Sequence, residues 1–557
     1  MRILFTSALR KPSVLLLSIL VFTALLRDSL AADEKPEPRT IKASDTVEIV
    51  RIGVGLTQVL ELEKNIKARF SEFESDFLFS ISDSMPGLDQ VTSNVAFGQC
   101  VGVVLPDLEN YFGVAVPLEI RDIFEEDYEI GEDADGNTLI DGQVAVKSDR
   151  YLGYTEVPEE VQFENSTQVS RQLMDFASQS ENDLLTIESF PITMGRSLLK
   201  GPLRAFGIAL DTAAQRRDDE SDIEYSYRSL TSGHLAKLME LFFRDVERVR
   251  FCASSSDSEH PFSFEVVVDC RKKSELLTYF QELQRRRNRS LSWLHPNACS
   301  FATIALGLPE RIQEQLLSAG KATAVGIQEA GLGANAIAQT EGVFRGLAES
   351  GAFEALLQQV PFDEESTCYV GVLPLASGSV FDSELVQLVS AQDSLTTITE
   401  VDGWPIYSAD GWLDLELEEG WVPYVVATDS MLSLMVLQEA DKEKGVALLT
   451  ELIQREFSPA RQGARYANAI FAAEFSFSDV VNFSGNDGDD WSTLLPDNAE
   501  TNESGNRIQL DQDRVLWSIG LDQNQVTAKC HFQPNSVTFG VLSFETLTEV
   551  ISGIVDF

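Results

Sequence analysis

The cysteines and histidines are the residues that would most directly carry chemistry, and their spacing argues against a metal centre. The 557-residue chain has six cysteines, no CxxC pair and four scattered histidines, which are His234, His260, His295 and His531. A zinc site needs ligands at short, paired spacings. Cys530 and His531 are adjacent, but neighbouring side chains on a strand point to opposite faces. We therefore expect no metal site.

Two of the cysteines are placed where a disulfide could form. Cys252 and Cys270 fall in two β-rich runs, 248–253 and 262–270, and the polar stretch between them ends in Pro261. An antiparallel hairpin centred on residue 261 would set the two cysteines opposite each other, ~4.5–5.5 Å apart at Cα, which a disulfide can bridge. The alternative is two buried thiols in a hairpin whose register differs by a residue or two.

One acidic turn resembles part of a calcium-binding loop. Asp133, Asp135 and Asn137 alternate around Gly136. An EF-hand loop with this glycine at its sixth position needs an acidic first ligand and a terminal Glu, but the chain has glycine at both positions. We therefore predict a β-hairpin tip. A second acidic run, 486–490, is expected to be a solvated loop, with loose Ca²⁺ binding as the alternative.

The run Gly331–Ala336 matches the G-x-G-x-x-A pattern of dinucleotide sites. Such a motif must join a strand to a helix, with an acidic residue about 20 positions further on. Residues 321–328 could supply the strand and Glu354 the acid. The Ala-rich run that follows is, however, typical of a plain helix, and exported enzymes rarely meet free NAD. We therefore expect no cofactor.

Other catalytic motifs are missing from the sequence. There is no G-x-S-x-G, no H-E-x-x-H and no Walker loop. The 88 Asp and Glu residues guarantee many carboxylate pairs, so such pairs carry no information. We therefore assign no catalytic residue from the sequence.

The charge balance restricts the partners of the chain. It has 43 Lys and Arg against 88 Asp and Glu, a formal net charge of −45. Nucleic-acid binding needs clustered basic residues that release counterions from phosphates, and anionic lipid head groups repel so acidic a chain. We therefore expect no nucleic-acid partner. The acidity is interpreted as a means of staying soluble.

The N-terminus has the three regions of a secretion signal. The first eleven residues carry three bases, residues 14–26 are apolar, and Ser29 and Ala31 put small side chains before the cleavage point. The apolar run is shorter than the ~20 residues that span a membrane. We predict a signal peptide over 1–31, a polar leader over 32–44, a periplasmic or secreted location and no integral membrane span after cleavage. An uncleaved anchor is the alternative.

The remainder alternates short β-rich runs with amphipathic helical runs, which indicates an α+β protein. Strands are expected at 264–268, 301–306, 368–373, 424–427 and 515–521. Helices are expected at 57–73, 232–249, 274–287, 309–319, 341–359 and 442–457.

Two short similarities indicate an internal repeat. The run Cys100–Pro106 resembles Cys368–Pro374, and Ile52–Leu56 resembles Ile304–Leu308. Asp-Gly turn signals follow each copy of the first run. If the first pair of runs is equivalent, Cys100 should superpose on Cys368.

These similarities predict two α+β halves, 45–295 and 297–557, joined by a linker near 290–298. Each half would be a mainly antiparallel sheet with helices packed on it. The halves should then share one strand order.

Two further runs carry a resemblance to other proteins. The first run is Glu220–Tyr225, which is followed by a helix and by a strand ending at 264–269. The second is Pro86–Asp89, which is followed by Phe97-Gly98 and a strand. They resemble the middle and N-terminal patterns of large exported proteins of planctomycete bacteria, which have no assigned function. The chain departs from that pattern at 272–274, where Lys-Lys-Ser replaces a Gly-Thr pair. The resemblance implies an exported α+β protein and supplies no catalytic residues.

The leading hypothesis from the sequence is an exported, non-enzymatic binding or structural protein of the periplasm or cell envelope. One alternative is a carboxylate-based hydrolase, for example acting on glycans, which needs two carboxylates in a cleft. The other is a carrier of an apolar ligand, which needs a large apolar cavity.

Overall fold

The fold is known from a computed structural model. It describes residues 39–75, 88–104, 109–120, 130–134, 137–140, 142–157, 161–197, 215–216, 222–255, 260–284, 287–329, 334–363, 366–375, 395–409, 420–454, 465–484, 494–497, 499–501 and 508–545. The predicted signal peptide, residues 331–333 of the glycine motif and the acidic run 486–490 lie outside these ranges.

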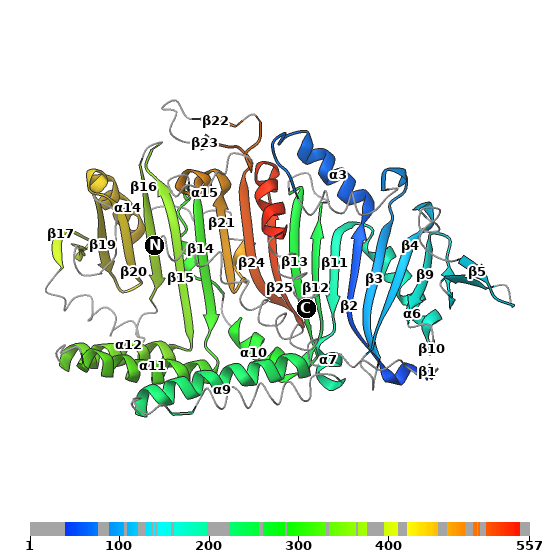
Figure 1. Ribbon diagram of the computed structural model, residues 1–557. Coiled ribbons are helices and arrows are strands. Elements are labelled where there is room, and N and C mark those ends of the chain that lie inside the picture. Colours follow the sequence, from blue (N-terminus) through cyan, green and yellow to red (C-terminus); the bar gives the residue numbers. More distant parts are fainter. Residues whose placement is uncertain are drawn as a thin grey trace.

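One 18-stranded antiparallel sheet dominates the molecule and confirms the α+β class (Figure 1). Seven strands from the first part of the chain lie side by side in the order β9 (Tyr151–Glu156), β4 (Glu109–Pro117), β3 (Ala96–Val104), β2 (Thr46–Gly55), β11 (Asp183–Ser189), β12 (Val246–Ser254) and β13 (Phe262–Cys270). The short strand β8 (Val146–Lys147) pairs with β9 at the outer edge.

Seven strands from the second part have the same order when both parts are read outward from the strands where they meet. Beside β13 lie β25 (Gln525–Phe532), β24 (Arg514–Asp522), β21 (Phe471–Ser476), β14 (Ser300–Gly307), β15 (Ala352–Pro361), β16 (Thr367–Pro374) and β20 (Met431–Gln438). β19 (Trp421–Ala427), β18 (Trp404–Ser408) and β17 (Thr396–Val401) extend this end. The last strands of the two parts, β13 and β25, pair with each other and make the sheet continuous.

This order corrects one equivalence expected from the sequence. Counting along the chain, β2 corresponds to β14, so the similar runs 52–56 and 304–308 end corresponding strands. β3, which holds Cys100, corresponds to β15, whereas Cys368 lies on β16. The Cys100–Cys368 equivalence is therefore wrong; Val-Gly-Val is a common strand pattern that occurs on two non-corresponding strands.

Helices cover both faces of the sheet. One face carries an aromatic core that includes Phe251, Phe262, Phe532 and Phe544, together with α3 (Leu56–Lys67), α15 (Phe477–Ser484) and the helical residues 537–545. The other face carries α6 (Ser166–Ser180) over β2, β3, β4 and β9, and α14 (Lys442–Gln454) near β20. A fully buried Phe or Leu side chain contributes ~1.5–3 kcal/mol, so these contacts hold the helices to the sheet.

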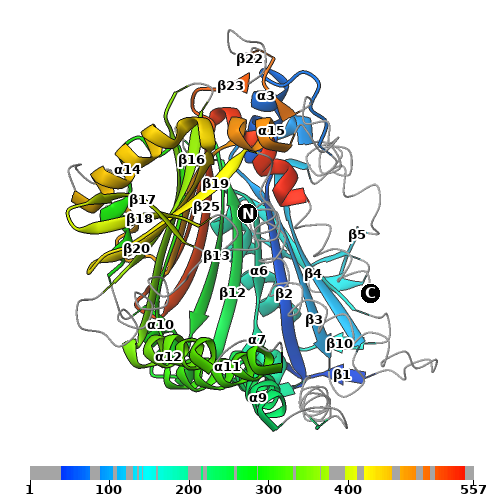
Figure 2. The same cartoon turned by 90° about the vertical axis from the view of Figure 1, so that its left-hand side faces the viewer.

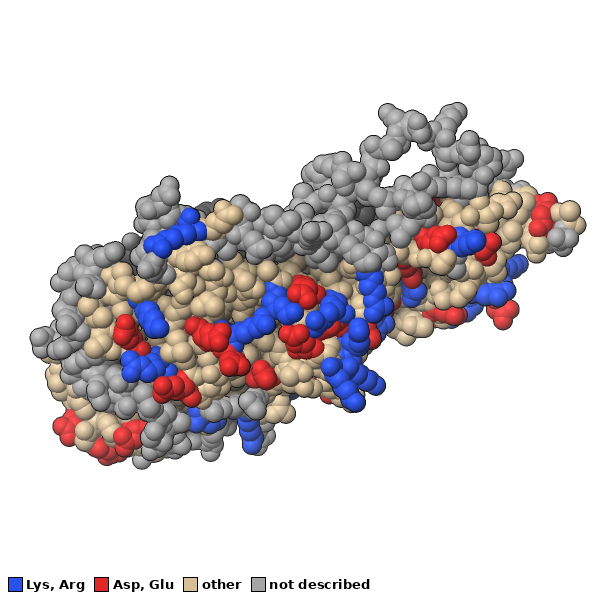
Figure 3. Space-filling view, turned by 90° about the horizontal axis from the view of Figure 1, so that it is seen from below, with Lys and Arg blue, Asp and Glu red and all other residues tan. Residues whose placement is uncertain are grey.

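Further helices lie along one end of the strands. α9 (Asp222–Asp245), α11 (Glu310–Glu329) and α12 (Ala334–Ser350) run across this end of the curved sheet in both views (Figures 1 and 2). α7 (Pro191–Ser197) and α10 (Glu275–Leu283) pack against α9. Seen from this end, basic and acidic side chains are intermixed (Figure 3), and Lys237 and Arg244 of α9 pair with Glu240 and Glu275.

The predicted elements are present, but several boundaries differ. All five predicted strands and all six predicted helices overlap an observed one. α9 starts ten residues earlier than predicted and ends at Asp245, where β12 begins at once. α12 ends at Ser350, and β15 occupies residues predicted to be helical. The run 290–298, expected to join the two halves, lies between the last strand of the first part and the first strand of the second. It is not an exposed linker, because Leu291, Trp293 and Leu294 are buried in the core of the second part.

Two local predictions are also resolved. β5 (Ile130–Glu132) and β6 (Thr138–Ile140) pair as a hairpin, and Asp133 Oδ1 accepts a 2.8 Å hydrogen bond from the Asn137 backbone N–H. The strands that flank the acidic turn thus form the predicted hairpin, whereas Asp135 and Gly136 lie outside the described residues. Residues 321–328 are part of helix α11, not a strand, so the glycine motif lacks the strand that a dinucleotide site requires.

Candidate functional site

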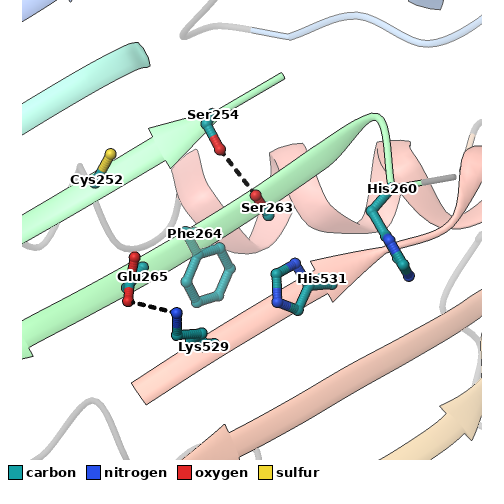
Figure 4. Close-up of a pocket in the computed structure, with 8 residues that line it drawn as sticks. All are labelled: Cys252, Ser254, His260, Ser263, Phe264, Glu265, Lys529 and His531. Atoms are coloured by element: carbon teal, nitrogen blue, oxygen red, sulfur yellow. Dashed lines mark hydrogen bonds and ion pairs between the residues drawn. The ribbon is translucent and has the colours of Figure 1, made fainter. Parts of the chain in front are cut away.

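A polar pocket lies in the middle of the sheet, on the face that also carries α6 and α14. Its volume is about 270 Å³. The lining residues come from β12, from the turn before β13, and from β13 and β25 (Figure 4): Cys252, Ser254, His260, Ser263, Phe264, Glu265, Lys529 and His531. The pocket therefore sits where the two parts of the chain meet.

Strand alternation explains why polar groups gather here. On β25, Cys530 and Phe532 are buried in the aromatic core, which leaves Lys529 and His531 on the opposite face. This confirms the expectation that Cys530 and His531 point to opposite faces. On β13, Phe262 enters the same core, whereas Ser263 and its cross-strand neighbours line the pocket.

The lining residues form two rows across three strands. In one row Cys252 lies opposite Glu265, which lies opposite Lys529. Lys529 Nζ and Glu265 Oε1 are 2.9 Å apart, with side chains 46% and 31% exposed, so the pair is accessible to a ligand. In the other row the Ser254 and Ser263 hydroxyls are hydrogen-bonded at 2.9 Å.

The second row ends in a pair of imidazoles. His531 lies opposite Ser263, and its ring centre is 5.3 Å from that of His260. His260 comes from the turn before β13 and is separated from His531 by about half of the chain (Figure 4). The pocket thus brings together hydroxyls, a carboxylate, an ammonium group and two imidazoles.

The thiol in the pocket is not an activated nucleophile. Burial raises the pKa of Cys252 to about 12, and the negative charge of Asp183 adds to the effect. Burial likewise raises the pKa of every other cysteine: Cys100, Cys270, Cys299 and Cys368 to about 12, and Cys530 well above the usual value. Since the thiolate is the reactive form, all six are inert structural thiols at neutral pH.

The predicted disulfide between Cys252 and Cys270 is absent, and both thiols are free. The hairpin register sets Cys252 opposite Glu265 and Cys270 opposite Val246. Cys270 is five positions after Glu265, about 17 Å along a strand, whereas bridged cysteines lie within ~7 Å at Cα. The hairpin turns earlier than position 261, which moves the register past the one that the disulfide needs.

The remaining histidines lie elsewhere and have structural contacts. His234 is in the middle of α9, where its Nε2 is 3.2 Å from the Tyr279 hydroxyl, and burial lowers its pKa. His295 is buried, with its Nε2 3.4 Å from Glu451. Neither reaches the pocket.

A ladder of ion pairs supports the sheet beside the pocket. Arg248 on β12 donates to Glu188 on β11 and to Asp269 on β13, each at 2.7 Å. Gln525 on β25 donates to Asp269 at 2.7 Å, and Arg51 on β2 lies 3.9 Å from Glu188. Burial lowers the pKa of Arg248, but its hydrogen bond to Asp269 and the charge of Glu188 outweigh this and raise it. The ladder therefore fixes the relative positions of the strands that carry the pocket.

The alternatives from the sequence need features that this pocket does not have. A hydrolase of the carboxylate type needs two carboxyl groups ~5–9.5 Å apart, but Glu265 is the one carboxylate among the eight lining residues and it pairs with Lys529. A carrier of an apolar ligand needs an apolar cavity, but most of the lining side chains are polar. Within the described ranges, no cluster of three or more His, Cys, Asp or Glu could hold a metal.

Comparisons with known proteins add no relative: no family model, no curated protein and no solved structure matches the chain. Among the described helices, none is long and apolar enough to cross a membrane.

The pocket is not predictable from the sequence, because the β13–β25 pairing joins residues more than 250 positions apart. The alternation of core-type and polar residues in 262–265 (Phe-Ser-Phe-Glu) and 529–532 (Lys-Cys-His-Phe) was the available signal. It shows that each strand has one polar face, but not that these faces adjoin.

Proposed function

We propose that this chain is an exported binding protein whose ligand is a small polar molecule held in the pocket between β13 and β25. The observation that carries the proposal is the set of paired but accessible polar groups, above all Glu265 and Lys529. A ligand with a carboxylate and a cationic group could exchange partners with this ion pair. The volume of about 270 Å³ suits a small molecule rather than a polymer.

The raised thiol pKa values and the single paired carboxylate favour binding over covalent or general acid–base catalysis at this site. They support the non-enzymatic hypothesis over the hydrolase. A structural contribution to the cell envelope is compatible with the same molecule, since the long continuous sheet is a rigid platform.

The binding proposal is tested by ligand-detected NMR with mixtures of small polar compounds in a buffer that contains a chelator. We expect hits with the wild type that disappear in the double variant Glu265→Gln/Lys529→Met. The control is Lys237→Met on α9, which removes a surface ion pair far from the pocket. Hits that persist in the double variant would place the binding site elsewhere, and turnover of a glycan that depends on Glu265 would favour the hydrolase.

Export is part of the same proposal. The order of basic, apolar and small residues in 1–31 supports cleavage after Ala31 and a periplasmic or secreted location. N-terminal sequencing of protein recovered outside the cytoplasm should begin at Ala32. Membrane-bound protein that retains Met1–Ala31 would contradict it.

We also infer that the two parts of the chain arose by internal duplication. Support comes from the shared order of seven strands and from the similar runs 52–56 and 304–308 on corresponding strands. The pocket would then lie at the junction of two related halves.

A further inference from the structure

The two imidazoles at the pocket have the spacing of a pair of metal ligands. The ring centres of His260 and His531 are 5.3 Å apart and the rings are tilted by 54°. Two imidazoles whose nitrogens each lie ~2.0–2.1 Å from one tetrahedral ion have ring centres ~5 Å apart. The observed spacing therefore needs little rearrangement for both rings to contact one ion.

The chemistry of the two side chains suits the same role. Each imidazole has two ring nitrogens, so one can bind a metal while the other keeps a hydrogen bond. His531 is held on strand β25, and its neighbour in the row, Ser263, is itself hydrogen-bonded to Ser254. One ligand is thus on a rigid strand, and the other is brought to it by the β12–β13 hairpin.

The electrostatic surroundings do not oppose a cation. Lys529 is two residues from His531, but its charge is matched by Glu265 at 2.9 Å. The chain as a whole carries a net charge of −45, which raises the local concentration of cations.

We propose that His260 and His531 bind one divalent first-row transition metal at the edge of the pocket. Two protein nitrogens leave further coordination positions for water or for a donor atom of a pocket ligand. Imidazole ligands suit Cu²⁺, Ni²⁺ and Zn²⁺, and the general order of affinity places Cu²⁺ first. This inference rests on the proposed function in that it assigns a ligand class to the same pocket.

The test is calorimetric titration of the metal-free mature protein with Cu²⁺, Ni²⁺ and Zn²⁺. We expect one equivalent to bind, with Cu²⁺ tightest. His260→Ala and His531→Ala should each weaken binding at least ~10-fold, since loss of even an outer-shell partner costs 10–100-fold. His234→Ala is the matched control, because it removes an imidazole that lies on α9 beside Tyr279.

A spectroscopic measurement separates a ligand role from a structural one. Electron paramagnetic resonance of the Cu²⁺ complex should show coupling to two nitrogens in the wild type and to one in each single variant. Circular dichroism confirms that the variants are folded, and His531→Gln replaces His531→Ala if the latter is not. Wild-type binding no tighter than that of the His260→Ala/His531→Ala variant would overturn the proposal.

The outcome is distinguishable from failure of the proposed function. The NMR screen uses a chelator, so polar ligands that depend on Glu265 and Lys529 would be detected without any metal. Such ligands without metal binding would sink this inference alone. Metal binding without such ligands would leave the metal as the ligand of the pocket.

Discussion

At the scale of single residues, burial determines which groups can react. The pKa of Cys252 is about 12, whereas an unperturbed thiol has a pKa of ~8.5. At pH 8 the native thiol should therefore react with iodoacetamide about 1,000-fold more slowly than in urea, because the thiolate fraction falls tenfold per pH unit below the pKa. Mass mapping without reductant should find Cys252 and Cys270 as free thiols after unfolding. Rapid native labelling at Cys252, or a bridged peptide, would contradict this prediction.

A second residue-scale prediction concerns the ion-pair ladder. Arg248→Met leaves the side chains of Glu188 and Asp269, only 6% and 10% exposed, without their shared cation. Breaking a buried pair costs ~3–5 kcal/mol, and since Arg248 is itself 36% exposed we expect about 3 kcal/mol from urea unfolding. Lys237→Met, which removes a pair with the largely exposed Glu240, should cost less than ~1 kcal/mol. Equal losses of unfolding free energy in the two variants would show that the buried ladder stabilises the protein no more than an exposed ion pair does.

At the scale of elements, the end of α12 is marked in the sequence by a glycine, although the helical periodicity alone predicts a longer helix. Gly351 has φ +64° and follows the last helical residue, Ser350. This is the left-handed C-terminal position that favours glycine. The periodicity of 341–359 predicts one helix, but the structure has a strand after Gly351, and residues 353–360 alternate between half-buried and buried. The junction of α9 and β12 has no such glycine: the helix ends at Asp245 and the strand starts at Val246.

Gly351→Ala should destabilise the protein by about 1 kcal/mol, the usual cost of a left-handed conformation for an L-residue. No steric clash contributes, because the nearest atom to a new Cβ is 4.0 Å away. Gly520→Ala on β24 is the control: its φ is ordinary and its Cβ position is open, so thermal unfolding should change little. An equal loss of stability in Gly520→Ala would show that the left-handed backbone at Gly351 is not the cause of the effect.

A pH-dependent prediction concerns the junction of α9 and α10. Asp245 accepts hydrogen bonds from Arg244 and from the Leu276 backbone N–H at the start of α10. Burial raises the pKa of Asp245, but these bonds and the nearby positive charges outweigh it and hold the pKa below 3.8. A lowered folded-state pKa gives stability that is complete above the unfolded pKa of ~3.9 and is lost as pH falls through the folded pKa.

Asp245→Asn should therefore cost ~1.5–3 kcal/mol at pH 7, the range for hydrogen bonds to charged groups. The difference from the wild type should stay constant down to about pH 4 and shrink only below it. Urea unfolding at pH 7, 5 and 3.5 measures this. A difference that already declines between pH 7 and 5 would contradict the assignment.

At the scale of the whole molecule, the sequence carries the fold class and the existence of most elements, because these depend on local periodicity. It does not carry the joining of the sheet through β13 and β25, since nothing local selects one strand as the partner of another far away in the chain. The pocket depends on that joining, so His260 and His531 could not be paired from sequence. The same junction makes one aromatic core out of both parts: Phe251 of β12 stacks on Phe544 at 5.7 Å.

This shared core predicts that the two parts unfold together, and the tryptophans allow a direct test. All six tryptophans lie after residue 290, so intrinsic fluorescence reports on the second part of the chain.

Phe251→Ala in the first part should cost ~3–5 kcal/mol and should shift the fluorescence midpoint in urea as far as the circular dichroism midpoint. A Trp517→Phe background removes a tryptophan whose ring contacts Phe264 of β13. Phe112→Ala, at a phenylalanine that is 37% exposed, should shift neither midpoint appreciably. An unchanged fluorescence midpoint beside an earlier circular dichroism transition would mean that the two parts unfold independently, and that the β13–β25 junction does not couple them.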